Sequence, residues 1–294
     1  MDFKDTSFSK KQSLQCRGRL IRFDRPLLMG VLNITPDSFY SGSRILDPGK
    51  LREKAVQMTE EGADILDVGA YSSRPGARDI PETEELSRLE KALPVIRKAS
   101  PEPLLSVDTF RHRVAERAVR EFGADIINDV SGGNLDSDMF DTVARLGVPY
   151  VLMHMRGTPA NMQEHAVYKD VVNEIMLDFS GRINRLNRLG VKDIIIDPGF
   201  GFAKTVDHNF QILSRLGAFR IFQQPIMTGL SRKSMIYKTL DTTAEDALNG
   251  TTVLHALALM KGTNILRVHD VRPAREAILL VSRMLEAGSQ AEVR

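Results

Sequence analysis

The clearest pattern in this chain is a regular alternation of short apolar runs with longer segments of helical periodicity. Each run ends at a polar or turn residue, as strands buried on both faces of a parallel sheet do. In the run 193–199, three consecutive isoleucines precede Asp197, and Pro198 and Gly199 then prevent further strand pairing. Eight strands are predicted in this way, at residues 27–33, 63–69, 104–109, 124–130, 149–155, 193–199, 225–229 and 265–268.

The segments between these runs place apolar residues with the period of an α-helix. They predict helices at residues 51–61, 81–98, 111–122, 171–189, 244–260 and 272–285. Several predicted helices end at a glycine, the residue that most readily adopts the left-handed conformation just after a last helical turn; these are Gly62, Gly123, Gly147 and Gly190. A small hairpin is predicted ahead of the first buried strand, at residues 14–24.

Eight strand–helix units in a chain of 294 residues predict an α/β protein with a single (β/α)8 TIM barrel, which typically needs about 250 residues. We expect one domain over residues 1–294, with a flexible tail at 1–13, the hairpin at 14–25 and the barrel at 26–290. A doubly wound sheet is the alternative. The barrel is favoured because residues 33–37, Asn-Ile-Thr-Pro-Asp, stand where a dinucleotide-binding glycine motif would follow the first strand, and no P-loop is present.

The amino-acid composition limits the binding partners and the cellular compartment that can be expected for this protein. The formal net charge is only +2 although 27% of residues are charged, so the basic face of a nucleic-acid binder is not expected. Cys16 is the only cysteine, which excludes an internal disulfide and a multi-thiolate metal site and favours a cytoplasmic protein. Charged residues interrupt the segment 1–19, and no later apolar run reaches membrane-spanning length, so neither a secretory signal nor a membrane partner is expected.

Polar residues stand at or just past the ends of six predicted strands: Asn33, Asp67, Asp108, Asn128, Asp197 and Arg267. The carboxyl ends of the strands of a barrel meet at one mouth, so these side chains are expected to converge there. A single Asp or Asn at a strand end is often only a turn residue, and we interpret Asp67 and Asp129 in that way. The whole set, with Lys233 and Arg74 on the same rim, suits a flat, hydrogen-bonding heterocycle that carries a phosphate.

Several separate motifs between residues 27 and 271 together resemble the dihydropteroate synthase family. Each motif alone is weak, whereas their joint order is specific. The motifs are MGVLNITPDSF at 29–39, DVGAYSSRPG at 67–76, SVDT at 106–109, INDV at 127–130, MHMRGT at 153–158, DPGFGF at 197–202, GLSRKS at 229–234 and RVHD at 267–270.

The resemblance implies a transferase of folate biosynthesis, which condenses 6-hydroxymethyl-7,8-dihydropterin diphosphate with 4-aminobenzoate and is a target of sulfonamides. By this similarity the diphosphate leaves first, and the amine then traps a delocalised pterin cation. The resemblance assigns catalytic roles to Asn33, Arg74, Lys233, Arg267 and His269, and pterin binding to Asp108, Asn128, Met153, Asp197, Lys233 and Arg267. A homodimer is also implied, which agrees with the part of the predicted helix at 248–260, because that part is apolar on more than one face.

The same similarity distributes the remaining ligand contacts. Magnesium is expected on the side-chain oxygen of Asn33, since this ion prefers oxygen ligands and bridges phosphates. The residues expected to bind the diphosphate are Asn33, Ser73, Arg74, Arg267 and His269. Those expected to bind 4-aminobenzoate are Phe39, Pro75, Phe202 and Ser231, the last one at a predicted helix N-terminus.

One loop departs from the family pattern, because Ala70-Tyr71-Ser72-Ser73 replaces the more usual Gly-Glu-Ser-Thr. The hydroxyl at Ser73 is kept, whereas Tyr71 lacks the charge, so the role of position 71 is left open. Two other functions remain as alternatives. A pterin-binding methyltransferase on the same barrel would not need Arg74, His269 or the loop that carries Phe39, and a non-catalytic pterin-binding protein would not need Lys233 or Asn33.

Overall fold

The computed structural model describes residues 13–16, 18–35, 40–41, 45–72 and 79–291. Its first element is an antiparallel hairpin of β1 (Ser13–Cys16) and β2 (Arg19–Arg22), in which Ser13 pairs with Arg22. The predicted hairpin at 14–24 is therefore present. A second, very short hairpin is formed by β4 (Tyr40–Ser41) and β5 (Ile45–Leu46).

Eight parallel strands form the barrel, in the order β10-β9-β8-β7-β6-β3-β12-β11. The two ends of this order meet through a parallel bridge between Ile196 and Ile226, and Ile196 N donates a hydrogen bond to Pro225 O at 2.9 Å. This connection completes the ring, so the barrel is confirmed and the doubly wound alternative is wrong. The strands are β3 (Leu27–Asn33), β6 (Ile65–Gly69), β7 (Leu104–Asp108), β8 (Ile126–Asp129), β9 (Tyr150–Met153), β10 (Ile194–Asp197), β11 (Met227–Thr228) and β12 (Ile265–Val268).

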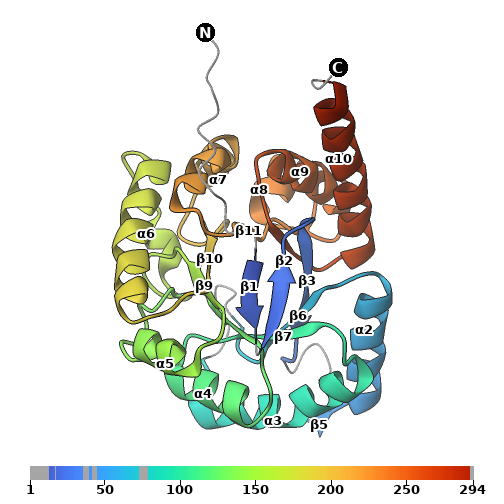
Figure 1. The fold of residues 1–294 in the computed structure, drawn as a ribbon, viewed down its shortest axis with the longest axis vertical. Helices are drawn as coiled ribbons and strands as arrows, with labels where there is room; N and C mark the ends of the chain where they lie inside the picture. Colours follow the sequence, from blue (N-terminus) through green and yellow to red (C-terminus); the bar gives the residue numbers. More distant parts are fainter. Residues whose placement is uncertain (1–12, 17, 36–39, 42–44, 73–78, 292–294) are drawn as a thin grey trace.

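Helices surround the barrel as a ring (Figure 1). They are α2 (Pro48–Glu60), α3 (Glu82–Ala99), α4 (His112–Arg120), α5 (Met139–Leu146), α6 (Val171–Arg188), α7 (Val206–Ser214), α8 (Ser234–Tyr237), α9 (Leu248–Met260) and α10 (Val271–Ala291), with 3-10 helices η1 (Met162–His165) and η2 (Leu216–Phe222). The four glycines predicted at helix ends all have positive φ, between 64° and 103°. Not one described helix combines the length and apolar character that crossing a bilayer requires.

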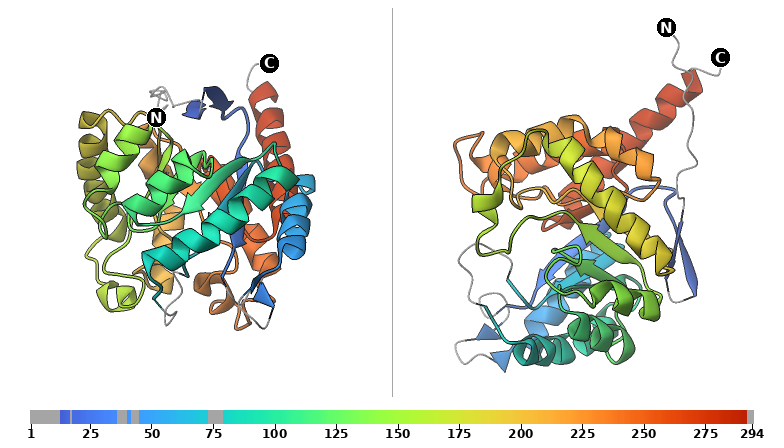
Figure 2. Two further views of the ribbon diagram at one scale, coloured as in Figure 1. Left: turned by 90° about the horizontal axis from the view of Figure 1, so that it is seen from below. Right: turned by 90° about the vertical axis from the view of Figure 1, so that its left-hand side faces the viewer.

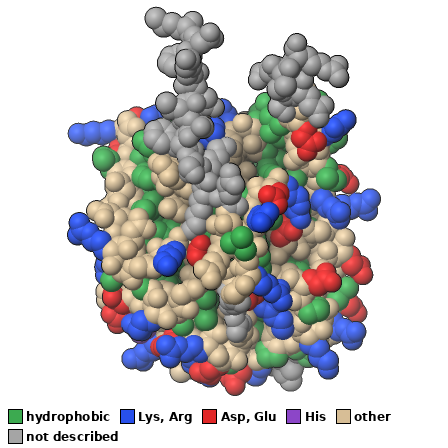
Figure 3. Space-filling view, in the orientation of Figure 1, with side chains coloured by type: hydrophobic (Ala, Val, Ile, Leu, Met, Phe, Trp, Pro, Cys, Tyr) green, Lys and Arg blue, Asp and Glu red, His purple; other side chains and the backbone are tan. Residues whose placement is uncertain are grey.

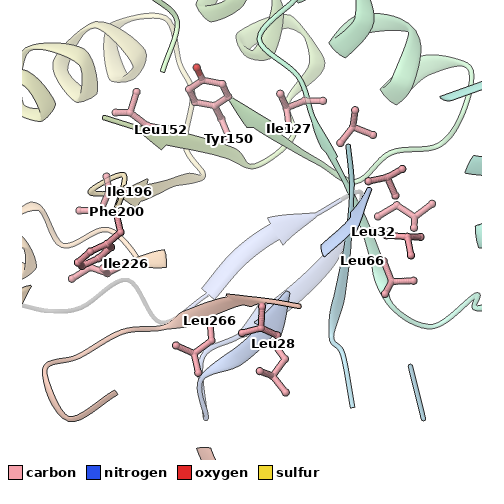
Figure 4. Close-up of a cluster of buried hydrophobic side chains, with 14 of the residues drawn as sticks. Leu28, Leu32, Leu66, Ile127, Tyr150, Leu152, Ile196, Phe200, Ile226 and Leu266 are labelled. Atoms are coloured by element: carbon pink, nitrogen blue, oxygen red, sulfur yellow. The ribbon is translucent and has the colours of Figure 1, made fainter. Parts of the chain in front are cut away.

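Alternation along the strands divides the core into two parts. Leu28, Leu66, Ile127, Leu152, Ile196 and Leu266 belong to the large cluster that strands and helices share (Figure 4). The residues next to them along each strand belong to a separate cluster inside the barrel, which contains Met29, Ile65, Ile126, Val151, Ile195 and Ile265. Successive side chains of a strand point to opposite faces, so this division follows from the period of two.

The inward-facing positions change from apolar to polar one period further along the strands. Ile65 is followed two residues later by Asp67, Ile126 by Asn128, Ile195 by Asp197 and Ile265 by Arg267. Because residues i and i+2 face the same side of a strand, these polar side chains lie inside the barrel toward its C-terminal end. The strand period therefore places the candidate site.

The hairpin β1–β2 closes the opposite end of the barrel. Leu14 and Cys16 are 2% and 1% exposed and belong to the inner cluster, with Leu27, Leu104 and Met227 from the strand starts. Figure 1 shows the hairpin in front of the strands, and Figure 2 shows it at the end of the molecule opposite β4 and β5. On the hairpin face, Lys and Arg side chains are interspersed with Asp and Glu (Figure 3). The C-terminal end is thus left as the ligand-binding mouth.

Candidate active site

Strand register brings four polar or small residues to one level across neighbouring strands. Asn33 at the end of β3 is paired with Gly69 of β6, Gly69 with Asp108 of β7, and Asp108 with Asn128 of β8. Further around the barrel, Asp197 of β10 is paired with Met153 of β9. The convergence that the sequence predicts for these strand ends is therefore present.

Arg267 on β12 is held by two carboxylates inside this mouth. Its Nε donates to Asp67 Oδ2 at 2.7 Å, and its Nη2 donates to Asp108 Oδ2 at 2.8 Å. The same Asp67 oxygen accepts a hydrogen bond from Asn128 Nδ2 at 2.9 Å. Asp67 lies in the middle of β6 and is fully buried, so its interpretation as a turn residue is wrong. Its Oδ1 is buried without a partner in the described structure, and is an acceptor that a ligand could use.

Asp129 behaves as the turn residue that the sequence predicts. Its Oδ1 accepts from the backbone and side chain of Ser131 at 2.8 and 2.7 Å, and its Oδ2 accepts from Gly133 N at 2.8 Å. Tyr150 also donates its hydroxyl to Asp129 Oδ2 at 2.7 Å. This carboxylate is therefore satisfied by its own turn and by a core tyrosine, and takes no part in the site.

Burial and nearby charges shift the pKa values of Arg267 and Asp108. Burial raises the pKa of Asp108 to about 7, against the opposing effect of Arg267, and the neighbouring Asp67 adds to the rise. Burial acts to lower the pKa of Arg267, but Asp67 and Asp108 raise that pKa overall. Arg267 is therefore a fixed cation, whereas Asp108 changes its charge close to neutral pH.

Asp197 and Lys233 form the second charged group of the mouth. Asp197 Oδ1 accepts a hydrogen bond from Gly199 N at 2.8 Å, and burial raises its pKa while Lys233 opposes that rise. Lys233 precedes α8 and donates its Nζ to the carbonyl of Phe200, with Nζ 4.7 Å from the centre of the Phe202 ring. Burial lowers the pKa of Lys233 to about 8, against the effect of Asp197. A cation thus faces both the carboxylate and the aromatic loop.

Two loops at the mouth are tied together through Ser231 and His269. Both the backbone N and the ring Nδ1 of His269 lie close to Ser231 Oγ, at 3.3 and 3.1 Å. The next residues form an ion pair, in which Arg232 Nε contacts Asp270 Oδ2 at 2.8 Å. The loops after β11 and β12 therefore present a hydroxyl and an imidazole side by side, and the Ser231 hydroxyl is already engaged by His269.

An apolar cluster lines the mouth beside Asp197. Met153 belongs to it, and Phe202 packs against it; its other buried members are Val130, Met155, Met162 and Ala203. Such a wall suits the faces of flat aromatic ligands, since binding pockets combine apolar walls with a few polar groups. The sequence predicts contacts for Met153 and Phe202 but not the four other members.

Four predicted site residues, Phe39, Ser73, Arg74 and Pro75, lie outside the described residues. Tyr71, just before three of them, is described. Its ring contacts Phe110 edge-on at 5.1 Å, and the Arg111 guanidinium lies 5.4 Å from its centre. Arg111 also donates to the buried Glu85 at 2.6 Å. Position 71, where the chain departs from the family pattern, therefore has an aromatic packing role at the base of its loop.

Two other features of the described structure lie apart from this network. His112, Asp136 and Asp138 place potential metal ligands within 4.8 Å of one another. Asp136, however, accepts hydrogen bonds from both the backbone N and Nδ1 of His112 at 2.8 Å, so its carboxylate satisfies the first residue of α4. A cavity of about 450 Å³ is lined by Arg25, Asp64, Glu102 and Arg275, near the N-terminal strand ends, and contains none of the site residues.

Comparison with known proteins agrees with this geometry. Residues 29–269 match the family described as pterin binding enzyme. The chain is 37% identical over 281 residues to dihydropteroate synthase of Escherichia coli K12. The matched region covers 93% of this chain and 97% of that protein. Dihydropteroate synthase from Thermus thermophilus in complex with 4-aminobenzoate superposes with a TM-score of 0.82, at 39% identity over 92% of this chain and 99% of that one.

Two more solved structures extend the comparison. The Thermus thermophilus enzyme has also been solved in complex with 6HMPPP, with a TM-score of 0.79, 37% identity, and coverage of 92% of this chain and 99% of that one. The Yersinia pestis dihydropteroate synthase, in a complex with a sulfonamide drug, gives a TM-score of 0.85 at 35% identity, with coverage of 93% and 99%.

A parallel barrel whose C-terminal mouth carries this polar network, and whose sequence matches that family description, is a pterin-binding enzyme. The similarity of this chain to individual relatives covers nearly their whole length, so the family within the pterin-binding enzymes can be specified. The chain belongs to the dihydropteroate synthase family, and the family resemblance of the motifs is confirmed.

Proposed function

We propose that this chain condenses 6-hydroxymethyl-7,8-dihydropterin diphosphate with 4-aminobenzoate to give 7,8-dihydropteroate and diphosphate. The observation that carries the proposal is Arg267, whose guanidinium is held inside the mouth by Asp67 and Asp108, next to Asn128. The ligands in the Thermus thermophilus structures, 4-aminobenzoate and 6HMPPP, support the same pair of substrates.

The pterin edge is assigned to Asp197 and Asn128. A carboxylate can accept two parallel hydrogen bonds, which suits the adjacent amino group and ring N–H of a pterin. Gly199 N holds one oxygen of Asp197, and this contact orients the carboxylate. Asn128 directs its amide nitrogen to Asp67, so its carbonyl oxygen is the atom that would face the ligand. Met153, paired with Asp197 on the neighbouring strand, supplies an apolar wall.

Three further side chains are assigned to the rest of the ring system. Arg267 would stack its planar guanidinium on the pterin face, in an orientation that its two carboxylate partners hold. Asp108 would accept a ring N–H, and Lys233 would donate to the ring carbonyl and a ring nitrogen. Lys233 already points to a carbonyl oxygen, that of Phe200, so its Nζ lies among acceptors before a ligand arrives.

The reaction breaks the bond between the pterin methylene carbon and the diphosphate oxygen, and the electron pair leaves with the diphosphate. Positive charge that develops on the pterin is stabilised by the carboxylates Asp67, Asp108 and Asp197, which are preorganised by their hydrogen bonds. The amine nitrogen of 4-aminobenzoate then forms the new bond to carbon and loses a proton. No covalent enzyme intermediate is required.

The departing diphosphate is assigned to Arg267, His269, Ser73 and Arg74, the last two of which lie outside the described residues. Magnesium would be held by Asn33, whose side-chain oxygen is a suitable hard ligand. Asn33 Oδ1 would lie only 3.1 Å from a Cβ at Gly69, so the oxygen is turned toward the barrel, where the glycine leaves room. When bound, the ion would neutralise charge on the diphosphate.

The 4-aminobenzoate site is assigned to Phe202 and Ser231, with Phe39 and Pro75 from outside the described residues. Phe202 offers an aromatic face beside Lys233 at 4.7 Å. The Ser231 hydroxyl is paired with His269 at 3.1 Å, so the carboxylate would meet this pair rather than a lone hydroxyl.

A homodimer is proposed from the exposed face of α9. Val253, Leu257 and Met260 are 51%, 41% and 56% exposed and follow the helical spacing of four and three residues, so they form one stripe. The opposite stripe, which includes Leu254 and Ala258, is buried. A helix that is apolar on both faces is stabilised when a second surface covers the outer one.

The domain organisation and the cellular location can also be proposed. We infer one cooperative domain, because the hairpin shares the inner cluster of the barrel through Leu14 and Cys16. A cytoplasmic location is proposed because Cys16 is the only cysteine, so the chain forms no internal disulfide, which agrees with a reducing compartment.

The test is release of pyrophosphate by purified protein incubated with the pterin diphosphate, 4-aminobenzoate and magnesium. The proposal predicts that pyrophosphate and dihydropteroate form in equal amounts and that both substrates are required. A pterin-binding methyltransferase would instead transfer a methyl group to or from a reduced pterin and release no pyrophosphate. A non-catalytic pterin-binding protein would bind the pterin without turnover.

A further inference from the structure

Lys204 is the only buried lysine among the described residues, and its ammonium lies where two mouth loops meet. Its Nζ contacts the carbonyl oxygens of Gly199 and Phe202, each at 2.9 Å, and that of His154 at 3.2 Å. A fourth neighbour is His154 Nδ1, also at 3.2 Å. Lys204 therefore joins the loop after β9 to the loop after β10.

All four neighbours of this nitrogen offer lone pairs. An ammonium has three N–H donors, whereas a neutral amine has two N–H donors and a lone pair of its own, so the site matches the charged form. Burial lowers the pKa of Lys204, and the Asp197 carboxylate opposes that effect. Burial also lowers the pKa of His154 to about 2, and the positive charge of Lys204 contributes, so this imidazole is a neutral acceptor.

The two loops that Lys204 joins approach each other closely. Gly199 has φ of 72°, and a Cβ there would lie 2.1 Å from His154 O, so the two loops touch backbone to backbone. Gly199 O also accepts a hydrogen bond from Phe202 N at 3.1 Å, within its own loop. Lys204 is the donor that the carbonyls of His154, Gly199 and Phe202 share, and it satisfies buried acceptors that would be costly without one.

The loop that Lys204 holds carries two of the proposed substrate contacts, Asp197 and Phe202, and its Phe200 carbonyl binds a third, Lys233. Asp197 is oriented by Gly199 N, whose residue also gives its carbonyl to Lys204. Phe200 O receives Lys233, and the carbonyl of Phe202 is bound directly by Lys204. The buried ammonium therefore binds Phe202 directly and is connected to the Asp197 carboxylate through Gly199.

We propose that Lys204 is a positioning residue for the pterin site: by binding the carbonyls of His154, Gly199 and Phe202, it holds the loop after β10 so that Asp197 faces the ligand. The inference rests on the proposed role of Asp197 in pterin binding. Lys204 touches no substrate in this assignment and acts through the loop and through its charge.

The charge of Lys204 has a separate effect on Asp197. The positive groups that act on this carboxylate are Lys233 before α8, Arg267 on β12 and Lys204. The other charged groups near Lys204 are Arg156 and Asp178. Because these cations favour the ionised carboxylate, removal of Lys204 raises the pKa of Asp197 further. Pterin binding, which needs the carboxylate, is then lost at a higher pH as the solution is acidified.

The experiment measures pterin affinity by calorimetry for the full-length parent, Lys204→Met, Lys204→Arg and Asp197→Asn, from pH 5 to pH 8. Lys204→Met is expected to bind at least about tenfold more weakly at pH 7, a loss on the order of 1.4 kcal/mol in binding free energy, and to lose affinity at higher pH than the parent. Lys204→Arg retains the charge and should recover the parental pH dependence. Lys261→Met is the matched surface control, since Lys261 is partly exposed and its Nζ binds the carbonyl of Ser214, away from the site.

The outcomes separate the two proposals. If Asp197→Asn binds the pterin like the parent, the proposed role of Asp197 is wrong. If Asp197→Asn loses binding while Lys204→Met keeps the parental affinity and pH dependence, the role of Lys204 is wrong. If Lys204→Met does not fold, lysine side-chain ¹⁵N NMR of the parent at pH 7 is the test instead. A solvent-protected ammonium supports the inference, and its absence overturns it.

Discussion

Asp67 and Arg267 are separated by 200 positions in the sequence, yet Arg267 Nε donates to Asp67 Oδ2 at 2.7 Å inside the barrel. The contact joins the second strand of the barrel to its last and is made where the inner face changes from apolar to polar. Asp67 also accepts from Asn128, so a single oxygen orients both a cation and an amide toward the mouth.

Replacement of Asp67 should therefore disturb two other residues of the site, Arg267 and Asn128. Asp67→Ala removes the common partner of two buried donors, and we expect a loss of about 1–3 kcal/mol in the free energy of unfolding. The pterin dissociation constant should rise at least about tenfold, since Arg267 and Asn128 both lose their orientation. Chemical denaturation and calorimetry measure the two effects.

Asp67→Asn serves as the control that keeps the shape of the side chain and removes its charge. Its amide oxygen can still accept from Asn128 and Arg267, so it should weaken pterin binding less than Asp67→Ala does. Equal pterin affinity in Asp67→Ala and the parent would show that Arg267 and Asn128 are held without Asp67.

Pterin affinity should have a maximum between about pH 7 and about pH 8. Burial raises the pKa of Asp108 to about 7, so below that pH the carboxylate is protonated and no longer accepts the ring N–H. Burial lowers the pKa of Lys233 to about 8, so above that pH the donor charge is lost. Calorimetry over this range should show both limbs. Asp108→Asn should remove the loss of affinity near pH 7, so that only the loss set by protonation of Asp197 remains on acidification. Lys233→Met should remove the alkaline limb, and a flat profile in the parent would contradict both assignments.

The exposed stripe of α9 should form the dimer contact. Leu257→Asp places a charge in the middle of Val253, Leu257 and Met260, and we expect the dimer to dissociate because a buried, unpaired charge is costly. The fold should survive, since Leu257 is 41% exposed in a single subunit. Analytical ultracentrifugation measures the assembly. Leu177→Asp on α6, at a leucine that is 74% exposed, is the matched control and should remain dimeric. A parent that is monomeric at micromolar concentration would contradict the proposal.

The hairpin should unfold together with the barrel. Leu14→Ala creates a cavity in the inner cluster, and we expect a cost of about 2–5 kcal/mol in the free energy of unfolding. Denaturant unfolding should remain a single transition, with pterin affinity unchanged because the hairpin lies at the opposite end of the barrel from the mouth. Two separate transitions would show that the hairpin is not part of one cooperative domain.

Much of the barrel could be predicted from the sequence because each strand has a recognisable pattern within its own few residues. Three isoleucines followed by Asp197, Pro198 and Gly199 indicate a buried strand and its end without any knowledge of partners. The helices α5, α7 and α8 were not among the predicted segments; the last is only four residues long, which is too short for a period to be visible.

The roles of Asp67 and Lys204 could not be predicted for a different reason. Asp67 resembles a strand-end residue until the pairing of β6 shows that it lies in mid-strand and faces the barrel interior. Lys204 follows a glycine-rich loop, where a lysine is ordinarily solvated. Its burial depends on the approach of His154 from another strand, and no pattern within the segment reports that contact. The burial and the roles of these two residues are determined by partners far away in the sequence, not by the local periodicity.

Binding of the pterin by the polar network at the C-terminal mouth underlies every role proposed above, and a crystal structure with a bound pterin tests it. The predicted result places the ring inside the barrel mouth, with its amino edge on Asp197, an edge contact to Asn128 and its face against the Arg267 guanidinium. A pterin seated elsewhere, for example in the cavity of about 450 Å³ near Arg25 and Arg275, would contradict these assignments.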